Sequence, residues 1–323
     1  MPGAAAPAGI NTIKSLKMAK FNGKIIGTDS DSLAPGVFMS DVFSVMPEAR
    51  EESLFIDKLF ELVKIHRITV LMPSSGFDIY PYSKYRKELH KIGAFAVVSD
   101  MEALEICRDK LRTYQELTPK FKVPLTTTEP EKIPRFPVIA KPRFGKGSRD
   151  VIMIEDESDL GYVTSKYHDM IFQDYLPGIE YTIDVLSDLN RDPLFAVPRI
   201  RLQTKGGIST KGKIVRNQTI EEDCMNIAKS VGIRGPCCMQ MKEAEDGELQ
   251  LVEVNARLGG GTIFTTLAGA NFPALILDLV EGKKITVPKI SEVTVIRYFE
   301  EIVVNDSLRP QASPTPIKQT EKR

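Results

Sequence analysis

The sequence predicts a mixed protein, α/β in its first part and α+β in the rest, on the basis of three observations. Between residues 24 and 98, short apolar runs alternate with helical patterns, as in a parallel sheet with crossover helices. Residues 137–154 have the pattern of two strands joined by a glycine-containing loop. Residues 237–255 form two apolar runs around Asp246-Gly247, a dipeptide typical of hairpin turns. With 323 residues, the chain is long enough for two or three domains.

The remaining elements follow in chain order. The first part starts with a predicted helix at residues 9–16. Predicted strands at residues 24–29, 68–73 and 94–98 alternate with helices near 53–63 and 83–92. Residues 271–282 have the pattern of a helix that ends at a glycine, and residues 293–304 that of closing strands. The composition then turns polar and rich in proline, so we expect a disordered tail at 305–323.

The most informative segment is residues 251–261. A predicted strand places Glu253 and Asn255 two residues apart, and therefore on one side. Carboxylate and amide oxygens are hard ligands that suit Mg²⁺ together with phosphate. Arg257 and three glycines follow, and these residue types allow a phosphate to come close. The segment therefore predicts a site for magnesium and phosphate.

The residue types in the loop at residues 143–149 also suit a phosphate ligand. Lys141 ends the strand before it, where its ammonium can project over the loop. Gly145 and Gly147 allow backbone N–H groups to turn toward an anion, and Ser148 adds a hydroxyl donor. A solvated hairpin tip is the alternative for such a loop taken alone. The lysine at the strand end favours phosphate binding.

Residues 171–186 read as a strand, a Pro-Gly bend and a second strand. The bend predicts a short irregular segment between two sheets. Its free backbone groups can hydrogen-bond an adenine edge, and Glu180, just after the bend, can accept hydrogen bonds from ribose hydroxyls.

Together these three segments resemble the ATP-grasp superfamily, in particular single-copy proteins related to the large chain of carbamoyl-phosphate synthase. The resemblance implies a Rossmann-like pre-ATP-grasp domain at residues 1–105 and an ATP-grasp domain at 106–304. Within the second domain it implies a small ATP-clamping subdomain at about 115–175. In the resembled family a first strand precedes the loop that corresponds to residues 3–9. We therefore expect that this strand is missing here, through a misplaced start codon or genuine loss.

The resemblance also assigns roles to individual residues. It places ATP contacts at Lys110, Lys141, Gly145, Gly147, Ser148, Gln173, Tyr175, Leu176 and Glu180. It places Mg²⁺, for which Mn²⁺ is a substitute, at Gln240, Glu253 and Asn255. A hairpin around the Asp-Gly turn can bring Gln240 beside the other two metal residues. Arg257 corresponds to a phosphate-facing arginine of the family.

A basic segment at residues 197–213 contains five Lys or Arg residues and no acid. Arg199 and Arg201 share a strand face, which suits γ-phosphate or a carboxylate substrate. The spacing from Gly207 to Lys213 is similar to a P-loop, but Ile214 stands where a metal-binding Ser or Thr is needed. We expect residues 203–213 to form a mobile basic lid, with a solvated loop as the alternative.

The resemblance implies an ATP- and Mg²⁺-dependent carboxylate–amine ligase. Because the sequence shows no signal peptide and no long apolar stretch, we expect a cytoplasmic protein. A small carboxylate would attack ATP to give an acyl phosphate, a small amine would displace phosphate, and Arg257, Arg199 and Arg201 would stabilise the transferred charge. One alternative is a carbamoyl-phosphate-synthase-like component that phosphorylates bicarbonate or carbamate and needs a partner chain. Another is a non-catalytic ATP-binding module that regulates a partner. Among similar proteins homodimers are common.

Composition narrows these classes further. The 43 basic and 43 acidic residues cancel, so no global field favours nucleic acid or an anionic membrane. The longest apolar stretch, at 272–280, is too short to span a bilayer, and the four cysteines lack metal-ligand spacing. A dinucleotide-binding dehydrogenase is the rival for the first domain, because Asp29 lies where a ribose-binding acid is expected. The preceding loop lacks G-x-G-x-x-G, which argues against it.

Overall fold

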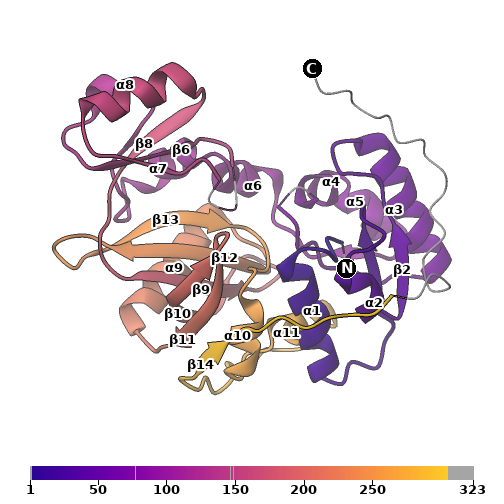
Figure 1. The fold of residues 1–323 in the computed structure, drawn as a ribbon. Coiled ribbons are helices and arrows are strands. Elements are labelled where there is room, and N and C mark those ends of the chain that lie inside the picture. Colours follow the sequence, from indigo (N-terminus) through magenta and orange to yellow (C-terminus); the bar gives the residue numbers. More distant parts are fainter. Residues whose placement is uncertain (1, 77, 146, 148, 305–323) are drawn as a thin grey trace.

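The computed structural model describes residues 2–76, 78–145, 147 and 149–304. The predicted tail at 305–323 and the predicted phosphate contact at Ser148 lie outside the described residues. Figure 1 shows an N-terminal unit on one side, a large sheet beside it, and a smaller sheet above the end of the large one.

The N-terminal unit alternates strands and helices, as predicted. Its elements are α1 (Pro7–Met18), β1 (Ile26–Asp29), α2 (Pro35–Met39), β2 (Val42–Val45), α3 (Glu52–His66), β3 (Val70–Leu71), α4 (Ile79–Lys84), α5 (Arg86–Lys91), β4 (Phe95–Ala96) and α6 (Met101–Arg108). Two parallel pairs form, β1 with β2 and β3 with β4, as separate two-stranded sheets. The single helix expected near 83–92 is wrong. Two short helices lie there, because Tyr85 leaves the helical conformation with φ −99° and ψ 17°.

A small antiparallel sheet follows the connecting helix α7 (Lys110–Leu117). It contains β5 (Thr126–Thr127), β6 (Val138–Pro142), β7 (Ile152–Ile154) and β8 (Met170–Asp174) in the order β5-β8-β6-β7, with a 3₁₀ turn at Pro130–Lys132. Helix α8 (Glu157–Lys166) packs on it through a core that includes Ala140, Val163 and Phe172. The predicted strand, glycine loop and strand are thus β6, residues 143–151 and β7.

The large sheet has six strands in the order β13-β12-β9-β10-β11-β14. These are β9 (Glu180–Ser187), β10 (Pro193–Lys205), β11 (Ile208–Ile214), β12 (Pro236–Glu243), β13 (Leu249–Asn255) and β14 (Thr294–Ile296). Helix α9 (Gln218–Val231) covers one face, where Ile227 packs near Ile183 and Met239. Helices α10 (Thr262–Leu267) and α11 (Phe272–Val280) cover part of the other face. The end of that face below the small sheet stays open.

Two expectations about this sheet are corrected. Residues 203–213 are not an irregular loop, because they continue β10 and β11 as an antiparallel hairpin with Lys205 opposite Ile208. Gly206 and Gly207 supply the left-handed turn, with φ +56° and +74°. Of the closing strands expected at 293–304, only β14 forms, paired with β11. Residues 297–304 form no strand, and Phe299 is 86% exposed.

Candidate functional site

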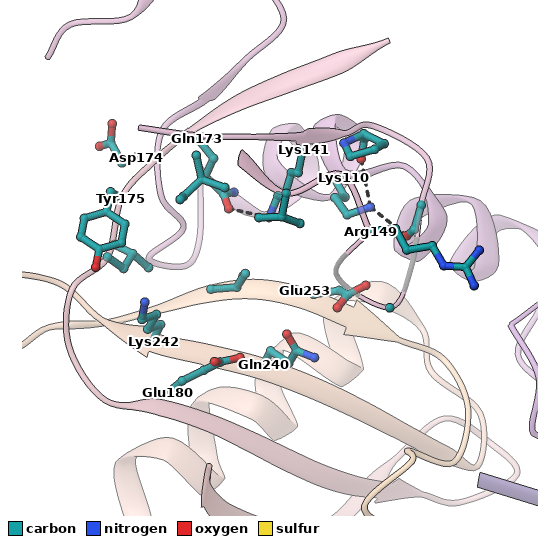
Figure 2. Close-up of a pocket in the computed structure, with 17 residues that line it drawn as sticks. Lys110, Lys141, Arg149, Gln173, Asp174, Tyr175, Glu180, Gln240, Lys242 and Glu253 are labelled. Carbon is teal, nitrogen blue, oxygen red and sulfur yellow. Dashed lines mark hydrogen bonds between the residues drawn. The ribbon is translucent and has the colours of Figure 1, made fainter. Parts of the chain in front are cut away.

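A pocket lies between the small sheet and the open face of the large sheet (Figure 2). The small-sheet wall and its loop contribute Ile139, Lys141, Pro142, Gly145, Gly147, Arg149, Val151, Gln173 and Asp174, with Lys110 from α7. The large-sheet wall contributes Glu180, Gln240, Lys242, Val252 and Glu253, and the segment between the two sheets contributes Tyr175 and Leu176. One wall is therefore rich in cations, and the other carries carboxylates and an amide.

Lys141 lies at the end of β6 with its side chain almost fully buried. Its Nζ donates a hydrogen bond of 2.7 Å to Gln173 Oε1, and Gln173 Nε2 donates one of 2.8 Å to Thr126 Oγ1. Burial lowers the pKa of Lys141 to about 8, although the Glu253 carboxylate opposes this shift. Because both polar atoms of Gln173 are engaged, its amide positions Lys141 in this structure. The Gln173 side chain, for which an adenine contact was predicted, is thus hydrogen-bonded within the protein.

The glycine-containing loop is anchored to the start of α7. Lys110 Nζ donates to the carbonyl oxygens of Pro142, at 3.2 Å, and Gly145, at 3.0 Å. Arg143 makes two hydrogen bonds to Asp109, with Nε to Oδ1 at 2.8 Å and Nη2 to Oδ2 at 2.5 Å. Burial acts to raise the pKa of Asp109, but the Arg143 guanidinium and backbone N–H groups hold this pKa below its usual range. The loop that faces the pocket is thus held at its first residues.

The predicted hairpin brings together an amide and a carboxylate. In the β12–β13 register, Gln240 lies directly opposite Glu253, and Asn255 lies opposite Cys238. The register shifts after Gln240, a bulge at which both Val252 and Glu253 line the pocket. Figure 2 shows the Gln240 and Glu253 side chains reaching into the same space.

These groups fit a hard metal ion. Within the part of the chain that the structure describes, neither the Gln240 amide nor the Glu253 carboxylate has a side-chain hydrogen bond or ion pair. Oxygen ligands of this kind suit Mg²⁺. Among the described residues, no three of His, Cys, Asp and Glu are grouped to hold a metal by themselves. An ion here would therefore need further ligands, such as phosphate oxygens or water, to complete its shell.

Asn255 and Arg257 lie beyond the wall of the pocket. The register confirms that Asn255 is on the same face of β13 as Glu253. Its Oδ1 accepts a hydrogen bond of 3.2 Å from Arg257 Nη2, and Arg257 Nη1 donates to Leu258 O at 3.0 Å. Both residues lie where the strand ends, next to Gln240 and Glu253.

Arg199 and Arg201 share the predicted strand face, but carboxylates of β9 already neutralise them. Arg199 is 1% exposed and pairs with Asp184 at 3.1 Å. Arg201 pairs with Glu180 at 2.5 Å and also donates to Gly207 O at 2.8 Å. Neither arginine lines the pocket, and Glu180 is held at the pocket by Arg201.

Two further cations were not predicted. Lys242 lies two residues after Gln240 on β12, and strand periodicity alone could have placed it in the pocket. Its Nζ lies 5.1 Å from the centre of the Tyr175 ring. Arg297 follows β14, and its guanidinium donates to Gly260 O and lies 5.0 Å from the Phe264 ring centre. Burial lowers the pKa of Arg297 to about 10. No local sequence pattern connects it with the glycines at 259–261.

Comparison with known proteins identifies a family that matches part of this chain. Residues 166–302 match a family described as "ATP-grasp in the biosynthetic pathway with Ter operon". The chain is an ATP-grasp superfamily protein. It is distantly related to the carbamoyl-phosphate synthase large chain and shares its fold with biotin carboxylase.

The sequence identity to three similar proteins shows that the relatives of this ATP-grasp protein are distant. A carbamoyl-phosphate synthase of Methanobrevibacter smithii is 22% identical, over 79% of this chain and 74% of the relative. A D-alanine–D-alanine ligase of Fusobacterium nucleatum is 25% identical, over 79% of this chain and 87% of the relative. The biotin carboxylase of Campylobacter jejuni, solved with β-γ-ATP, has a TM-score of 0.69 at 15% identity and covers 88% of this chain and 72% of that chain. Within the described residues, no helix is long and apolar enough to cross a membrane.

Proposed function

We propose that this protein is an ADP-forming carboxylate–amine ligase that uses ATP with Mg²⁺. The observation that carries the proposal is the pairing of two pocket walls. Lys110, Lys141 and the glycine loop form one wall, and the hairpin pair of Gln240 and Glu253 forms the other. Such an arrangement binds a polyphosphate on one side and its metal on the other. ATP-grasp proteins use ATP with Mg²⁺, which agrees with both walls.

Each residue has a defined part in this proposal. Lys110, Lys141 and the N–H groups of the loop hold the phosphates, and the backbone at Tyr175 and Leu176 holds the base, with Glu180 at the ribose. Gln240 and Glu253, with Asn255 beside them, would hold Mg²⁺, which supplies charge neutralisation when bound. Arg199 and Arg201 act indirectly, since each is paired with a β9 carboxylate. Arg257 follows the end of β13 and donates to Leu258 O, and Arg297 donates to Gly260 O.

The reaction proceeds in two transfers. A carboxylate oxygen of the acid substrate attacks the γ-phosphorus, the bond to the bridging oxygen breaks, and ADP leaves. The amine then attacks the carbonyl carbon of the acyl phosphate, and phosphate leaves from a tetrahedral intermediate. Closure of the small sheet over the pocket would exclude water, which otherwise hydrolyses the acyl phosphate. No side-chain nucleophile is needed.

One alternative substrate follows from the similarity to carbamoyl-phosphate synthase. In that case bicarbonate or carbamate would replace the organic acid, and a partner chain would supply the second half-reaction. Both reactions release ADP, so they are separated by substrate dependence alone.

The test is to incubate the protein with Mg²⁺ and ATP and with pooled amino acids and small carboxylates, with bicarbonate as a separate arm. Release of ADP and phosphate that depends on both an acid and an amine is expected. ADP release with bicarbonate alone would support the alternative. Formation of AMP and pyrophosphate would contradict an acyl-phosphate mechanism.

Glu253→Ala is expected to lower the rate of ADP formation on the order of 100-fold, because it removes the one carboxylate of the metal pair. Glu245→Ala is the matched control, since Glu245 is exposed in the turn of the same hairpin. Circular dichroism should show an unchanged fold for both variants. Full activity of Glu253→Ala would remove the metal assignment.

A further inference from the structure

The chain passes between the two pocket walls through residues 175–179, from the end of β8 to the start of β9. This crossing segment carries Tyr175 and Leu176, which line the pocket, and it leads directly into Glu180. Its position therefore sets where the base and ribose end of the pocket lies relative to the large sheet.

One residue outside the pocket holds this segment. Glu243, the last residue of β12, accepts a hydrogen bond on its carbonyl oxygen from Gly178 N at 3.0 Å, and its own N donates to Ile179 O at 3.0 Å. Its carboxylate accepts from Ile179 N at 3.2 Å through Oε2 and from the Tyr181 hydroxyl at 3.0 Å through Oε1. Both carboxylate oxygens and both backbone groups of Glu243 are thus hydrogen-bonded to Gly178, Ile179 or Tyr181.

The contact is close enough to require a glycine. A Cβ at Gly178 would lie 2.5 Å from Glu243 Cβ and 2.9 Å from its carbonyl oxygen. The Tyr181 hydroxyl is held as well, by its hydrogen bond to Glu243, and burial together with this hydrogen bond raises its pKa. The crossing segment therefore packs so closely against the end of β12 that neither can shift along the other.

Glu243 does not face the nucleotide. In β12, Gln240 and Lys242 point to the pocket, whereas Met239 and Met241 belong to the core under α9. Strand alternation puts Glu243 on that second face, together with Tyr181. Its influence on the pocket must pass through the crossing segment.

The other crossing uses the same hairpin. Between α7 and β5, Lys122 O accepts a hydrogen bond of 3.0 Å from Leu251 N, and Lys122 Nζ pairs with Glu248. Both connections of the small sheet are therefore fixed to the β12–β13 hairpin. That hairpin also carries Gln240 and Glu253.

We propose that Glu243 is a positioning residue of the nucleotide site, which fixes the crossing segment so that the base and ribose are held in register with the metal-binding pair. The inference rests on the proposed ATP site. It predicts a defect confined to the nucleoside part of ATP, because the phosphate-binding lysines lie on other elements.

The experiment compares the binding of two ligands, ATP and inorganic tripolyphosphate, each in the presence of Mg²⁺. Glu243→Ala should weaken ATP binding about tenfold, the effect of losing hydrogen bonds to a charged group, and leave tripolyphosphate binding within about twofold. Hydrogen exchange at the Gly178 and Ile179 amides should accelerate in the same variant. Glu245→Ala, with the same charge change in the same hairpin, should alter none of these.

Each contrary result has a separate meaning. Unchanged ATP binding by Glu243→Ala overturns the positioning role while the proposed function stands. Equal weakening of ATP and tripolyphosphate also overturns it, since this indicates general damage to the site. If Glu243→Ala does not fold, Tyr181→Phe decides, with an expected loss of about threefold for ATP alone; no loss overturns the role. Failure of the unaltered protein to bind ATP overturns both this inference and the proposed function.

Discussion

At the scale of single residues, Lys141 is a buried lysine whose partner, Gln173, is neutral. Three charged groups act on it from other elements, Glu253 from β13, Glu180 from β9 and Lys110 from α7. The carboxylates do not compensate for burial, and the pKa of Lys141 falls to about 8. In the free protein this side chain therefore loses its proton above about pH 8, in a range where an exposed lysine keeps it.

ATP affinity should for this reason depend on pH. Bound phosphate favours the protonated lysine, so binding above pH 8 must take up a proton, and the Kd for ATP should rise toward tenfold per pH unit there. Below about pH 7.5 it should be flat. Titration calorimetry in buffers of different ionisation enthalpy measures the proton uptake directly. Gln173→Glu should move the onset to higher pH, and a Kd constant up to pH 9.5 would contradict the role of Lys141.

The residues also show what a sequence can and cannot reveal about a site. Strand ends and period-two spacing predicted that Lys141 and Glu253 lie at a common site, and the family resemblance with a hairpin turn added Gln240; all three line the pocket. The pairing of Arg199 with Asp184 was not predicted. The two residues are fifteen positions apart on neighbouring strands, and their contact depends on the register between those strands. A charged side chain in a strand looks the same in sequence whether it faces a ligand or a buried carboxylate.

At the scale of elements, the glycine loop is held by the two-point hydrogen bond between Arg143 and Asp109. Asp109 also caps α7, since its Oδ1 accepts from Leu111 N at 3.1 Å and Arg112 N at 3.3 Å. The helix that carries Lys110 and the loop that faces the phosphates are therefore oriented by one carboxylate.

Arg143→Met should weaken ATP binding about fivefold, because it frees the loop but leaves the helix cap. Asp109→Ala should cost more, since it removes both the cap and the loop contact. The double variant should be no weaker than Asp109→Ala, as expected when one substitution already breaks the shared contact. Titration with ATP measures all three, and additive losses would show that the two residues act separately.

Elements were predicted well where at least one face of a strand is buried, as in β6, β8, β9 and β12. Elements were missed where the strand is exposed. Residues 202–206 at the tip of β10 are exposed, so their polar and basic pattern indicated a loop. Backbone pairing with β11 and two left-handed glycines, not side-chain burial, keep them extended. Such pairing leaves little trace in hydrophobic periodicity.

At the scale of the whole molecule, the N-terminal unit and the large sheet share one core. Leu59 and Leu104 of the first belong to the same buried cluster as Ile183 and Met239 of the second. The small sheet has a separate core around Phe172. Sequence patterns gave both sets of apolar residues but not which sets merge, because merging depends on long-range packing. The molecule is thus one large body with a smaller one attached through two crossings, as Figure 1 shows.

This division predicts that Mg²⁺ and ATP act as a bridge. In the free protein, amides of residues 126–174 should exchange faster than those of residues 180–255, because the small sheet has the smaller core. In the proposed complex, nucleotide would contact Lys141 on one body and, through the metal, Glu253 on the other, so exchange in the small sheet should slow. At 100 times the Kd, ATP with Mg²⁺ should stabilise the protein by about 2.7 kcal/mol.

ATP without Mg²⁺ should give less protection, since Gln240 and Glu253 then have no ion through which to reach the phosphates. Glu253→Ala should lose the difference between ATP with and without Mg²⁺, whereas Glu245→Ala should keep it. Exchange measured by mass spectrometry at equal ligand saturation separates protection from affinity. If Mg²⁺ makes no difference to protection in the unaltered protein, the metal does not join the two bodies, and the closure of the small sheet must depend on the lysines and the base alone.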